Sequence, residues 1–353
     1  MKKIKIKICE FHFDNESLKK HFIYKILKKY YDVEFSETPD YVFYNESTHE
    51  HLKYDCIKIF YTGENISPNF NLCDYAIAFD YLEFGDRYYR YPLYLMLESN
   101  EEDWAKKMGV DIDISKPEIF TQADLDRKKE FCSFIYSNYL GDMSRKGMFE
   151  MLSTYKKVNA AGSYLNNTGG KKVDNKLEYE MKHKFSIAFE NSSRSGYTTE
   201  KLWGGIAAKT IPIYWGNPDI HLEFYRERFI NCHDYSNFDD VVERIKEIDL
   251  DNNLYLSIIN SPVNSPNYNF QDIRQGFENF LRNIFDQPVE QAKRRTINSA
   301  RLDVIERNEK LIAFISPIQS LLLKCLARLY QPFKKIKFLE DLKHTHSRRK
   351  LKR

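Results

Sequence analysis

The sequence predicts an α/β protein of two Rossmann-like domains that face each other across a cleft, followed by a helical and basic carboxy-terminal tail. Strand-like apolar runs alternate with amphipathic helical stretches in two series. A charged segment with little apolar periodicity, residues 98–130, separates the two series. The chain of 353 residues is also too long for one ordinary core. We therefore expect domains over residues 1–122 and 123–287 and the tail over residues 288–353.

The first series of elements occupies the amino-terminal third. Residues 3–9, KIKIKIC, alternate lysine with apolar residues at period two, which is typical of a strand and not of a signal peptide. Residues 18–31 repeat apolar positions every three or four residues, so a helix is expected there. Further strands are expected at YDVEFS (31–36), DYVFYN (40–45), IKIFYTGEN (57–65) and DYAIAFDY (74–81). Apolar strands that alternate with helices indicate a parallel sheet covered on both faces.

The second series starts with the strand FCSFIYSN. The stretch SRKGMFEMLSTY (144–155) predicts a helix with Ser144 as a plausible cap, and KKVNAAGS predicts a short strand and a turn. After KLEYEMKH follows a compact βαβ unit, formed by the strand KFSIAFEN, the helix TEKLWGGIAAK and the strand TIPIYWG. Ligands bind outside the carboxyl ends of such strands, so we expect the site there.

Composition excludes several classes of protein. Net charge is only +3, from 54 basic and 51 acidic residues, which argues against a nucleic-acid partner. The six cysteines lack C-x-x-C spacing, so a zinc site and a disulfide framework are not expected. Without a window of about 18 apolar residues, no transmembrane helix is expected. These features predict a cytoplasmic protein, with the 25 tyrosines and 25 phenylalanines largely in its core.

Two cations point to a bound anion. Lys201 lies in the first turn of an expected helix, where a positive charge is normally unfavourable. Arg145 likewise lies in the first turn of another expected helix, over residues 144–155. Two helix amino ends that each carry a cation form a site for pyrophosphate, although both side chains could simply point into water. Gly196 suits a turn with positive φ, and the pair Gly204 and Gly205 indicates either a close approach of another group or a helix kink. No P-loop and no dinucleotide-binding glycine motif is present.

Acidic and polar side chains cluster around the same strand ends. Glu64 follows a glycine in a loop after a strand, where it is either a general base facing the cleft or a solvated carboxylate. Glu190 ends a strand, and Glu200 opens a helix, where the dipole alone favours it. Asn191 and Tyr197 offer hydrogen bonds suited to sugar hydroxyls. The histidines have no metal-ligand spacing, so no metal site is expected.

Two blocks of sequence resemble one enzyme family. The stretch FSIAFENSSRSGYTTEKLWGGIAAKTIPIYWGNPDI closely resembles the signature of the α-1,3-fucosyltransferases of glycosyltransferase family 10, in which F-E-N-S and Y-x-T-E-K flank a short spacer. A second block, IFYTGENISPNFNLCDYAIAFDYLEFGDRYYRYPLYL, resembles the amino-terminal block of the bacterial members. The resemblance covers most of residues 55–95 and 130–285. It departs at the spacer SRSG, where bacterial relatives often carry an aromatic residue, and Arg194 in this spacer receives no role.

The resemblance implies a GT-B fold, GDP-fucose as donor, and inverting transfer without an essential metal or cofactor. The implied acceptor is a hydroxyl, O3 of N-acetylglucosamine, in a lactosamine-type glycan of lipopolysaccharide. The products would be Lewis-type structures. The amino-terminal domain would bind the acceptor and the second domain GDP-fucose. By matching motif positions, Glu64 would be the general base, and Glu200 would bind the donor or stabilise positive charge on the sugar. The donor-binding residues implied in this way are Arg145, Glu190, Asn191, Tyr197 and Lys201.

The tail and the function each leave alternatives open. SLLLKCLARLYQPFKKIKFLEDL, followed by SRRKLKR, is a basic amphipathic segment suited to an anionic membrane surface, which would place the protein on the inner face of the cell membrane. It could instead pack on the protein or form a homo-oligomer contact. Another GDP-sugar transferase and a catalytically silent nucleotide-sugar or glycan binder are the alternative functions. The choice between type 1 and type 2 chains, and between a 3- and a 4-hydroxyl, is open.

Overall fold

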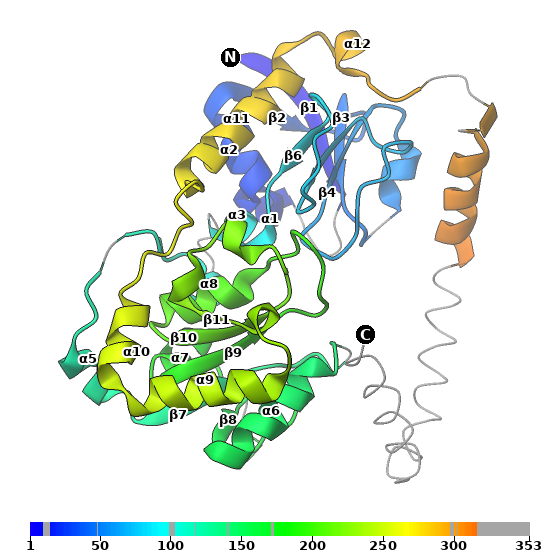
Figure 1. Cartoon of the computed structure of the whole chain (residues 1–353). Coiled ribbons are helices and arrows are strands. Elements are labelled where there is room, and N and C mark those ends of the chain that lie inside the picture. Colours follow the sequence, from blue (N-terminus) through cyan, green and yellow to red (C-terminus); the bar gives the residue numbers. More distant parts are fainter. Residues whose placement is uncertain are drawn as a thin grey trace.

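Two parallel β-sheets form the framework of the protein, one in each of two lobes (Figure 1). The structure is a computed structural model. It describes residues 1–9, 15–47, 49–98, 103–116, 118–139, 141–170, 173–296, 300–301 and 303–315. The predicted α/β class with two parallel sheets is confirmed.

The sheet of the first lobe has the strand order β2-β1-β3-β4-β5-β6, and every neighbouring pair is parallel. Its strands are β1 (Lys2–Cys9), β2 (Tyr31–Phe35), β3 (Tyr41–Tyr44), β4 (Ile57–Tyr61), β5 (Tyr75–Ala78) and β6 (Tyr88–Arg90). The sequence predicted the first five of these strands. The single helix expected over residues 18–31 is instead two helices, α1 (Asn15–Lys20) and α2 (Phe22–Tyr30). They separate because the His21 ring caps the second helix by accepting a hydrogen bond from the Ile23 amide.

The sheet of the second lobe has the order β11-β10-β9-β7-β8, also all parallel. Its strands are β7 (Glu130–Phe134), β8 (Val158–Ala160), β9 (His183–Phe189), β10 (Ile211–Trp215) and β11 (Ile230–Asn231). The βαβ unit predicted from the sequence is present, with α8 (Glu200–Ala207) between β9 and β10. Helix α6 has the predicted bounds, Ser144–Tyr155, but Ser144 as its cap is wrong. The cap position is Met143, and the Ser144 amide donates to the Asp142 carboxylate at 2.9 Å.

The remaining helices surround and join the two sheets. The α-helices are α3 (Leu93–Glu98), α4 (Asp103–Met108), α5 (Gln122–Arg127), α7 (Lys176–Glu180), α9 (Phe238–Leu250), α10 (Asn252–Ile259), α11 (Phe270–Asp286) and α12 (Val289–Ala292), and the 3-10 helices are η1 (Glu50–Lys53), η2 (Ile220–Leu222), η3 (Arg226–Arg228) and η4 (Cys232–Asp234). Helix α3 meets α8 where Tyr94 stacks on Trp203 with ring centroids 5.5 Å apart, so the core continues from one lobe to the other.

The glycine pair in α8 marks a close approach, as one of the two sequence interpretations proposed. A Cβ on Gly204 would lie 3.0 Å from the Met108 carbonyl oxygen of the segment between the lobes. A Cβ on Gly205 would lie 2.7 Å from the Ser186 hydroxyl of β9. The helix therefore packs against the connecting segment on one side and against the sheet on the other.

Helix α11 returns from the second lobe and packs on the first (Figure 1). Phe277 of this helix stacks on Tyr91 with centroids 4.1 Å apart, and Phe285 lies 4.4 Å from the Tyr41 ring. The sequence assigned residues 123–287 to the second domain, whereas these contacts attach residues 270–286 to the first sheet.

The chain continues along the first lobe after α11. Arg295 forms a buried ion pair with Asp74 at 2.8 Å, and residues 303–315 form a helix. The basic amphipathic segment expected beyond this helix, residues 316–353, lies outside the described residues. Within the described ranges, no helix combines the length and the apolar character needed to cross a bilayer.

Candidate functional site

A cavity of about 510 Å³ opens in the second lobe beside the amino ends of α6, α7 and α8. Four residues singled out from the sequence line it: Arg145, Asn191, Glu200 and Lys201. The expected meeting of Arg145 and Lys201 at one site is therefore confirmed. Glu64, Glu190 and Tyr197 are not among the lining residues.

Arg145 is a buried cation with one part of its guanidinium unsatisfied. The side chain is 1% exposed, and its Nε and Nη2 atoms donate to the Phe189 carbonyl at 3.3 and 3.0 Å. Nη2 also donates to the Asn191 side-chain oxygen at 2.6 Å, and the guanidinium lies over the Tyr136 ring, 4.3 Å from its centroid. Nη1 has no hydrogen-bond partner in the described part of the chain. Because a buried cation without a counter-charge is costly, Arg145 favours an anion in the cavity that it lines.

Lys201 has acidic partners within the chain, which the sequence interpretation did not foresee. Its ammonium lies 3.1 Å from Glu190 Oε2 and 3.2 Å from Glu200 Oε1. Burial acts to lower the pKa of Lys201, but the carboxylates of Glu190 and Glu200 more than offset it, so the pKa is raised and the side chain stays charged. The predicted need for a negative group near Lys201 is thus partly met by these two glutamates.

Glu190 organises the start of α8 from beneath the cavity. The side chain is fully buried, and its Oε1 accepts from the Thr199 amide at 2.8 Å while its Oε2 accepts from the Thr199 hydroxyl at 2.5 Å. A carboxylate at the amino end of a helix also interacts favourably with the helix dipole. Glu190 therefore holds both the first turn of α8 and the Lys201 ammonium.

Glu200 remains an ionised acid in the cavity wall. Burial acts to raise the pKa of its carboxyl, but Lys201 and then Lys176 lower it, and the net shift is downward. The cavity therefore presents a carboxylate together with the cations of Arg145, Lys176 and Lys201. This mixture suits a ligand that carries phosphates and also develops positive charge during reaction.

Tyr197 and Glu64 lie where the two lobes meet. Tyr197 is 1% exposed, and its ring packs edge-on against Phe79 of the first lobe with centroids 5.2 Å apart. Burial, followed by Glu190 and Glu64, raises the pKa of its hydroxyl. These interactions place Tyr197 between the acid of the first lobe and the acids of the second.

Glu64 follows β4 and faces this junction from the first lobe. Its side chain is exposed, yet the surrounding protein desolvates part of the carboxyl, and this desolvation together with Glu46 raises the pKa. Lys201 acts in the opposite direction, which shows that Glu64 lies within electrostatic range of the cavity. Among the residues that the structure describes, none forms a hydrogen bond or an ion pair with the Glu64 carboxylate. The carboxylate is therefore available to a proton donor.

Sequence reasoning missed several residues in the cavity wall, among them Lys107, Tyr136, Asn138 and Lys176. Lys176 is the first residue of α7, and its partner Glu180 is 3.9 Å away. It is therefore a cation in the first turn of a helix, the same signal that identified Lys201, and the same argument could have found it. Tyr136 carried no such signal, because its role as a platform for Arg145 depends on a contact between separate elements.

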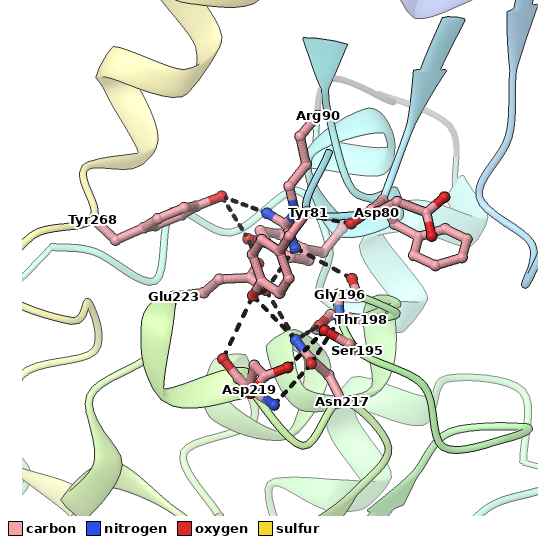
Figure 2. A network of polar contacts seen from close by, with 12 residues as sticks. Asp80, Tyr81, Arg90, Ser195, Gly196, Thr198, Asn217, Asp219, Glu223 and Tyr268 are labelled. Atoms are coloured by element: carbon pink, nitrogen blue, oxygen red, sulfur yellow. Dashed lines mark hydrogen bonds and ion pairs between the residues drawn. The ribbon is translucent and has the colours of Figure 1, made fainter. Parts of the chain in front are cut away.

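A buried polar network joins the lobes beside the site (Figure 2). Its centre is Glu223, which is fully buried and lies 2.7 Å from Arg90 of the first lobe. The Glu223 carboxylate also accepts from the hydroxyls of Tyr81 and Tyr94 at 2.8 and 2.5 Å and from the Asn217 amide at 3.1 Å. The network holds the ends of β6 and α3 against the second lobe.

Gly196 lies at the edge of this network. Its φ is +80°, as the sequence predicted, and its amide donates to Asn217 Oδ1 at 2.8 Å. A Cβ at this position would lie 2.4 Å from the Phe79 carbonyl oxygen. Only glycine satisfies both the backbone conformation and the close approach of the first lobe.

Two lobes with parallel sheets and a cation-lined cavity at helix amino ends define a glycosyltransferase of the GT-B type. Residues 6–97 match the model of the Alpha-(1,3)-fucosyltransferase FucT N-terminal domain, and residues 125–260 match that of the Glycosyltransferase family 10 (fucosyltransferase) C-terminal domain. The chain belongs to glycosyltransferase family 10, the fucosyltransferases.

Individual relatives support this assignment. The chain is 34% identical to the alpha-(1,3)-fucosyltransferase FucT of Helicobacter pylori over 318 residues, which is 79% of this chain and 66% of that protein. A crystal structure of an α1,3-fucosyltransferase with GDP-fucose superposes with a TM-score of 0.64 at 30% identity, covering 81% of this chain and 92% of that chain. Human 4-galactosyl-N-acetylglucosaminide 3-alpha-L-fucosyltransferase 9 is 28% identical over 143 residues, 39% of this chain and 38% of that protein. The chain thus spans just under two thirds of the length of the Helicobacter protein and a smaller share of the human one.

Proposed function

We propose that this protein transfers L-fucose from GDP-fucose to a hydroxyl group of a glycan acceptor. The observation that carries the proposal is the cavity lined by the side chains of Arg145, Lys176 and Lys201. Such a group of cations at helix amino ends suits the pyrophosphate of a sugar nucleotide. The solved relative with GDP-fucose supports the identity of that nucleotide.

The proposed reaction is a single displacement with inversion. Glu64 takes the proton from the acceptor hydroxyl as that oxygen attacks C1 of fucose, and the bond from C1 to the GDP oxygen breaks. The raised pKa of Glu64 brings its basicity closer to that of an effective general base. Arg145 and Lys201 stabilise the negative charge that develops on the departing GDP, and the Glu200 carboxylate stabilises positive charge on the sugar. The transfer needs no divalent metal in this scheme, because side-chain cations supply the electrostatic role.

The acceptor in this proposal is an N-acetyllactosamine-type glycan of lipopolysaccharide, fucosylated at O3 of N-acetylglucosamine to give a Lewis-type structure. The acceptor in the name of the human relative, a 4-galactosyl-N-acetylglucosaminide, supports the class of acceptor. The first lobe would bind this glycan, because it carries Glu64, which lies within electrostatic range of Lys201 in the second lobe.

The tail is a separate part of the proposal. We expect residues 316–353 to bind an anionic membrane surface on the cytoplasmic side. Residues 303–315 lead into that segment and present exposed Leu311, Ile312 and Phe314, a run of apolar side chains consistent with a surface that is covered in the functional state. Cosedimentation with anionic vesicles, lost in a truncation after Ile318, tests this part, and the oligomeric state of the same truncation tests the homo-oligomer alternative.

One assay tests the main proposal. The full chain is incubated with GDP-fucose and a panel of type 1 and type 2 lactosamine acceptors, and the linkage of each product is determined. Release of GDP with formation of a 3-linked fucoside is expected. Competition by GDP-mannose as an equally good donor would favour a different GDP-sugar transferase, and GDP binding without turnover on any acceptor would favour a silent binder.

A further inference from the structure

The spacer between β9 and α8, residues 192–196, crosses from the second lobe to the first. Its first contact is between the Ser192 hydroxyl and the Asn65 side-chain amide, which donates to it at 2.6 Å. Asn65 directly follows Glu64 in the loop after β4. The spacer of the second lobe therefore touches the loop that carries the proposed general base.

Arg194 makes the main contact of this spacer. Its Nη1 donates to Asn65 Oδ1 at 3.1 Å, and its Nη2 forms an ion pair with Asp80 at 2.7 Å. Nη2 also donates to the Ser67 hydroxyl, and the guanidinium lies over the Phe79 ring, 5.1 Å from its centroid. One side chain of the second lobe thus binds two loops of the first lobe, those that follow β4 and β5.

The spacer is itself held firmly by its own lobe. The Ser193 hydroxyl donates to the Gly216 carbonyl at 2.8 Å, and the Ser195 hydroxyl donates to Asp219 at 2.6 Å. Figure 2 shows Ser195, Gly196 and Asp219 side by side at this point, with Asp80 of the first lobe nearby. With Gly196 pressed against the first lobe as well, Arg194 projects from a rigid base.

The loop of Glu64 is held at two points, one on each side of this residue. On one side the Thr62 hydroxyl accepts from the Glu64 amide at 3.0 Å and donates to Glu46 at 2.7 Å within the first lobe. On the other side Asn65 is bound by Ser192 and Arg194 of the second lobe. The contact with Thr62 lies within the first lobe, which also carries Glu64. The contacts of Asn65 with the second lobe fix the position of the Glu64 loop relative to the donor cavity.

We propose that Arg194 is a positioning residue that holds the loop of Glu64 against the donor-binding lobe and so sets the distance between the base and the reacting sugar. The inference rests on the proposed function and deepens it. A general base has to lie within hydrogen-bond reach of its proton, and a displacement of about 1 Å costs up to about 100-fold in rate. Arg194 does not line the donor cavity, so its effect is on catalysis and not on nucleotide affinity.

The competing view is that Arg194 only forms a surface ion pair with Asp80. Its side chain is 36% exposed, and pairs at that exposure often contribute little to stability. The hydrogen bond from Arg194 to Asn65 distinguishes a positioning role from a surface ion pair. Asn65 is the residue next to Glu64, the proposed base, whereas the surface ion pair involves only Asp80. An experiment that couples Arg194 to Asn65 therefore decides between them.

Four variants of the full chain test the proposal: Arg194→Ala, Arg194→Lys, Asn65→Ala and the double variant. Arg226→Ala is the matched control, because Arg226 also forms an arginine–aspartate ion pair, with Asp234, but lies wholly within the second lobe. We expect Arg194→Ala to lower kcat by about 10- to 100-fold while the Kd for GDP changes less than about twofold. Arg194→Lys keeps a charge for Asp80 but not the fork that reaches Asn65, so its kcat should stay close to that of Arg194→Ala, whereas added guanidinium should restore part of kcat in the alanine variant.

The double variant should be no slower than the slower single variant, because both changes remove one clamp. Additive losses, a wild-type kcat in Arg194→Ala, or a loss confined to GDP affinity would each overturn the proposal. Should Arg194→Ala fold poorly, Asn65→Ala removes the same contact from the side of the first lobe without altering the spacer, and a fall in kcat is again expected.

Hydrogen exchange gives a readout that does not need activity. The amides of residues 62–67 should exchange faster in Arg194→Ala than in Arg226→Ala, and equal rates would contradict the clamp. If the wild-type protein fucosylates no acceptor, the proposed function fails, while the exchange result still decides whether Arg194 holds this loop.

Discussion

Glu190 Oε2 lies 3.1 Å from the Lys201 ammonium, and the same carboxylate binds the amide and hydroxyl of Thr199. This buried acid therefore balances the charge of the cation that we propose binds the donor phosphates. In the proposed function, a nucleoside diphosphate would give Lys201 a third anionic partner beside Glu190 and Glu200, while the first turn of α8 keeps its support. The ion pair between Glu190 and Lys201 explains how the amino end of α8 accommodates a positively charged side chain.

Replacing Glu190 by Gln should separate these two roles. The amide keeps a hydrogen bond to Thr199 but removes the charge beside Lys201, so we expect the free energy of unfolding to fall by about 2–3 kcal/mol in the absence of nucleotide. GDP should then raise the Tm of the variant by more than it raises that of the wild type, because the phosphates replace the lost charge. Thermal unfolding with and without GDP measures both effects, and an equal GDP shift in the two proteins would contradict the proposed balance.

Glu64→Gln should lower kcat by about 100-fold or more with an almost unchanged Kd for GDP, because the variant cannot accept a proton. The wild-type rate should fall at low pH as Glu64 takes up a proton, and its raised pKa places this limb above the pH expected for an ordinary glutamate. The charged groups acting on it are Glu46, Glu190, Glu200 and Lys201.

Glu46→Gln tests the origin of the acid limb. Removing this negative neighbour should lower the pKa of Glu64 and move the limb to lower pH, as measured by kcat/KM against pH. An unmoved limb would show that another group controls it.

Lys176→Met should weaken GDP binding by about 10-fold, because it removes one of the cations that line the cavity. Lys182→Met is the control, since Lys182 is exposed and absent from the cavity wall. Calorimetric titration with GDP compares the two. Equal affinities in both variants would exclude Lys176 from the phosphate site.

Gly196→Ala should destabilise the protein by more than about 2 kcal/mol, from the positive φ and from the contact with the Phe79 carbonyl. Gly85→Ala provides a matched comparison, because Gly85 also has a positive φ, +54°, but a Cβ there meets nothing within 4 Å. The difference between the two variants in denaturant unfolding isolates the contact between the lobes. A Gly85→Ala variant that is equally unstable would attribute the loss to backbone strain alone.

Treatment with EDTA followed by removal of the chelator should leave the rate of fucose transfer within about twofold of the untreated enzyme. Arg145, Lys176 and Lys201 supply the positive charge that a divalent ion provides in metal-dependent enzymes. Loss of activity that Mg²⁺ or Mn²⁺ restores would reject this part of the scheme.

Much of the local architecture follows from the sequence alone. The βαβ unit around α8 and the bounds of α6 were predictable, because periods of two and of three to four residues are short-range properties of the chain. The first-turn cations Arg145 and Lys201 were recognisable for the same reason, since a helix amino end needs only the neighbouring residues to define it. The positive φ of Gly196 was predictable as well.

Tertiary structure decided which of these elements meet. Nothing in the amphipathic pattern of α11 predicts that its phenylalanines pack on Tyr41 of β3 and on Tyr91, which directly follows β6, because an apolar face indicates burial but not a partner. The sequence likewise shows the charges of Glu190 and Arg194, but not that one balances Lys201 and the other binds Asn65 of the opposite lobe. Local periodicity extends over a few residues, whereas the contacts of α11 and of Arg194 join segments more than a hundred residues apart, and only the packing of the two lobes brings those segments together.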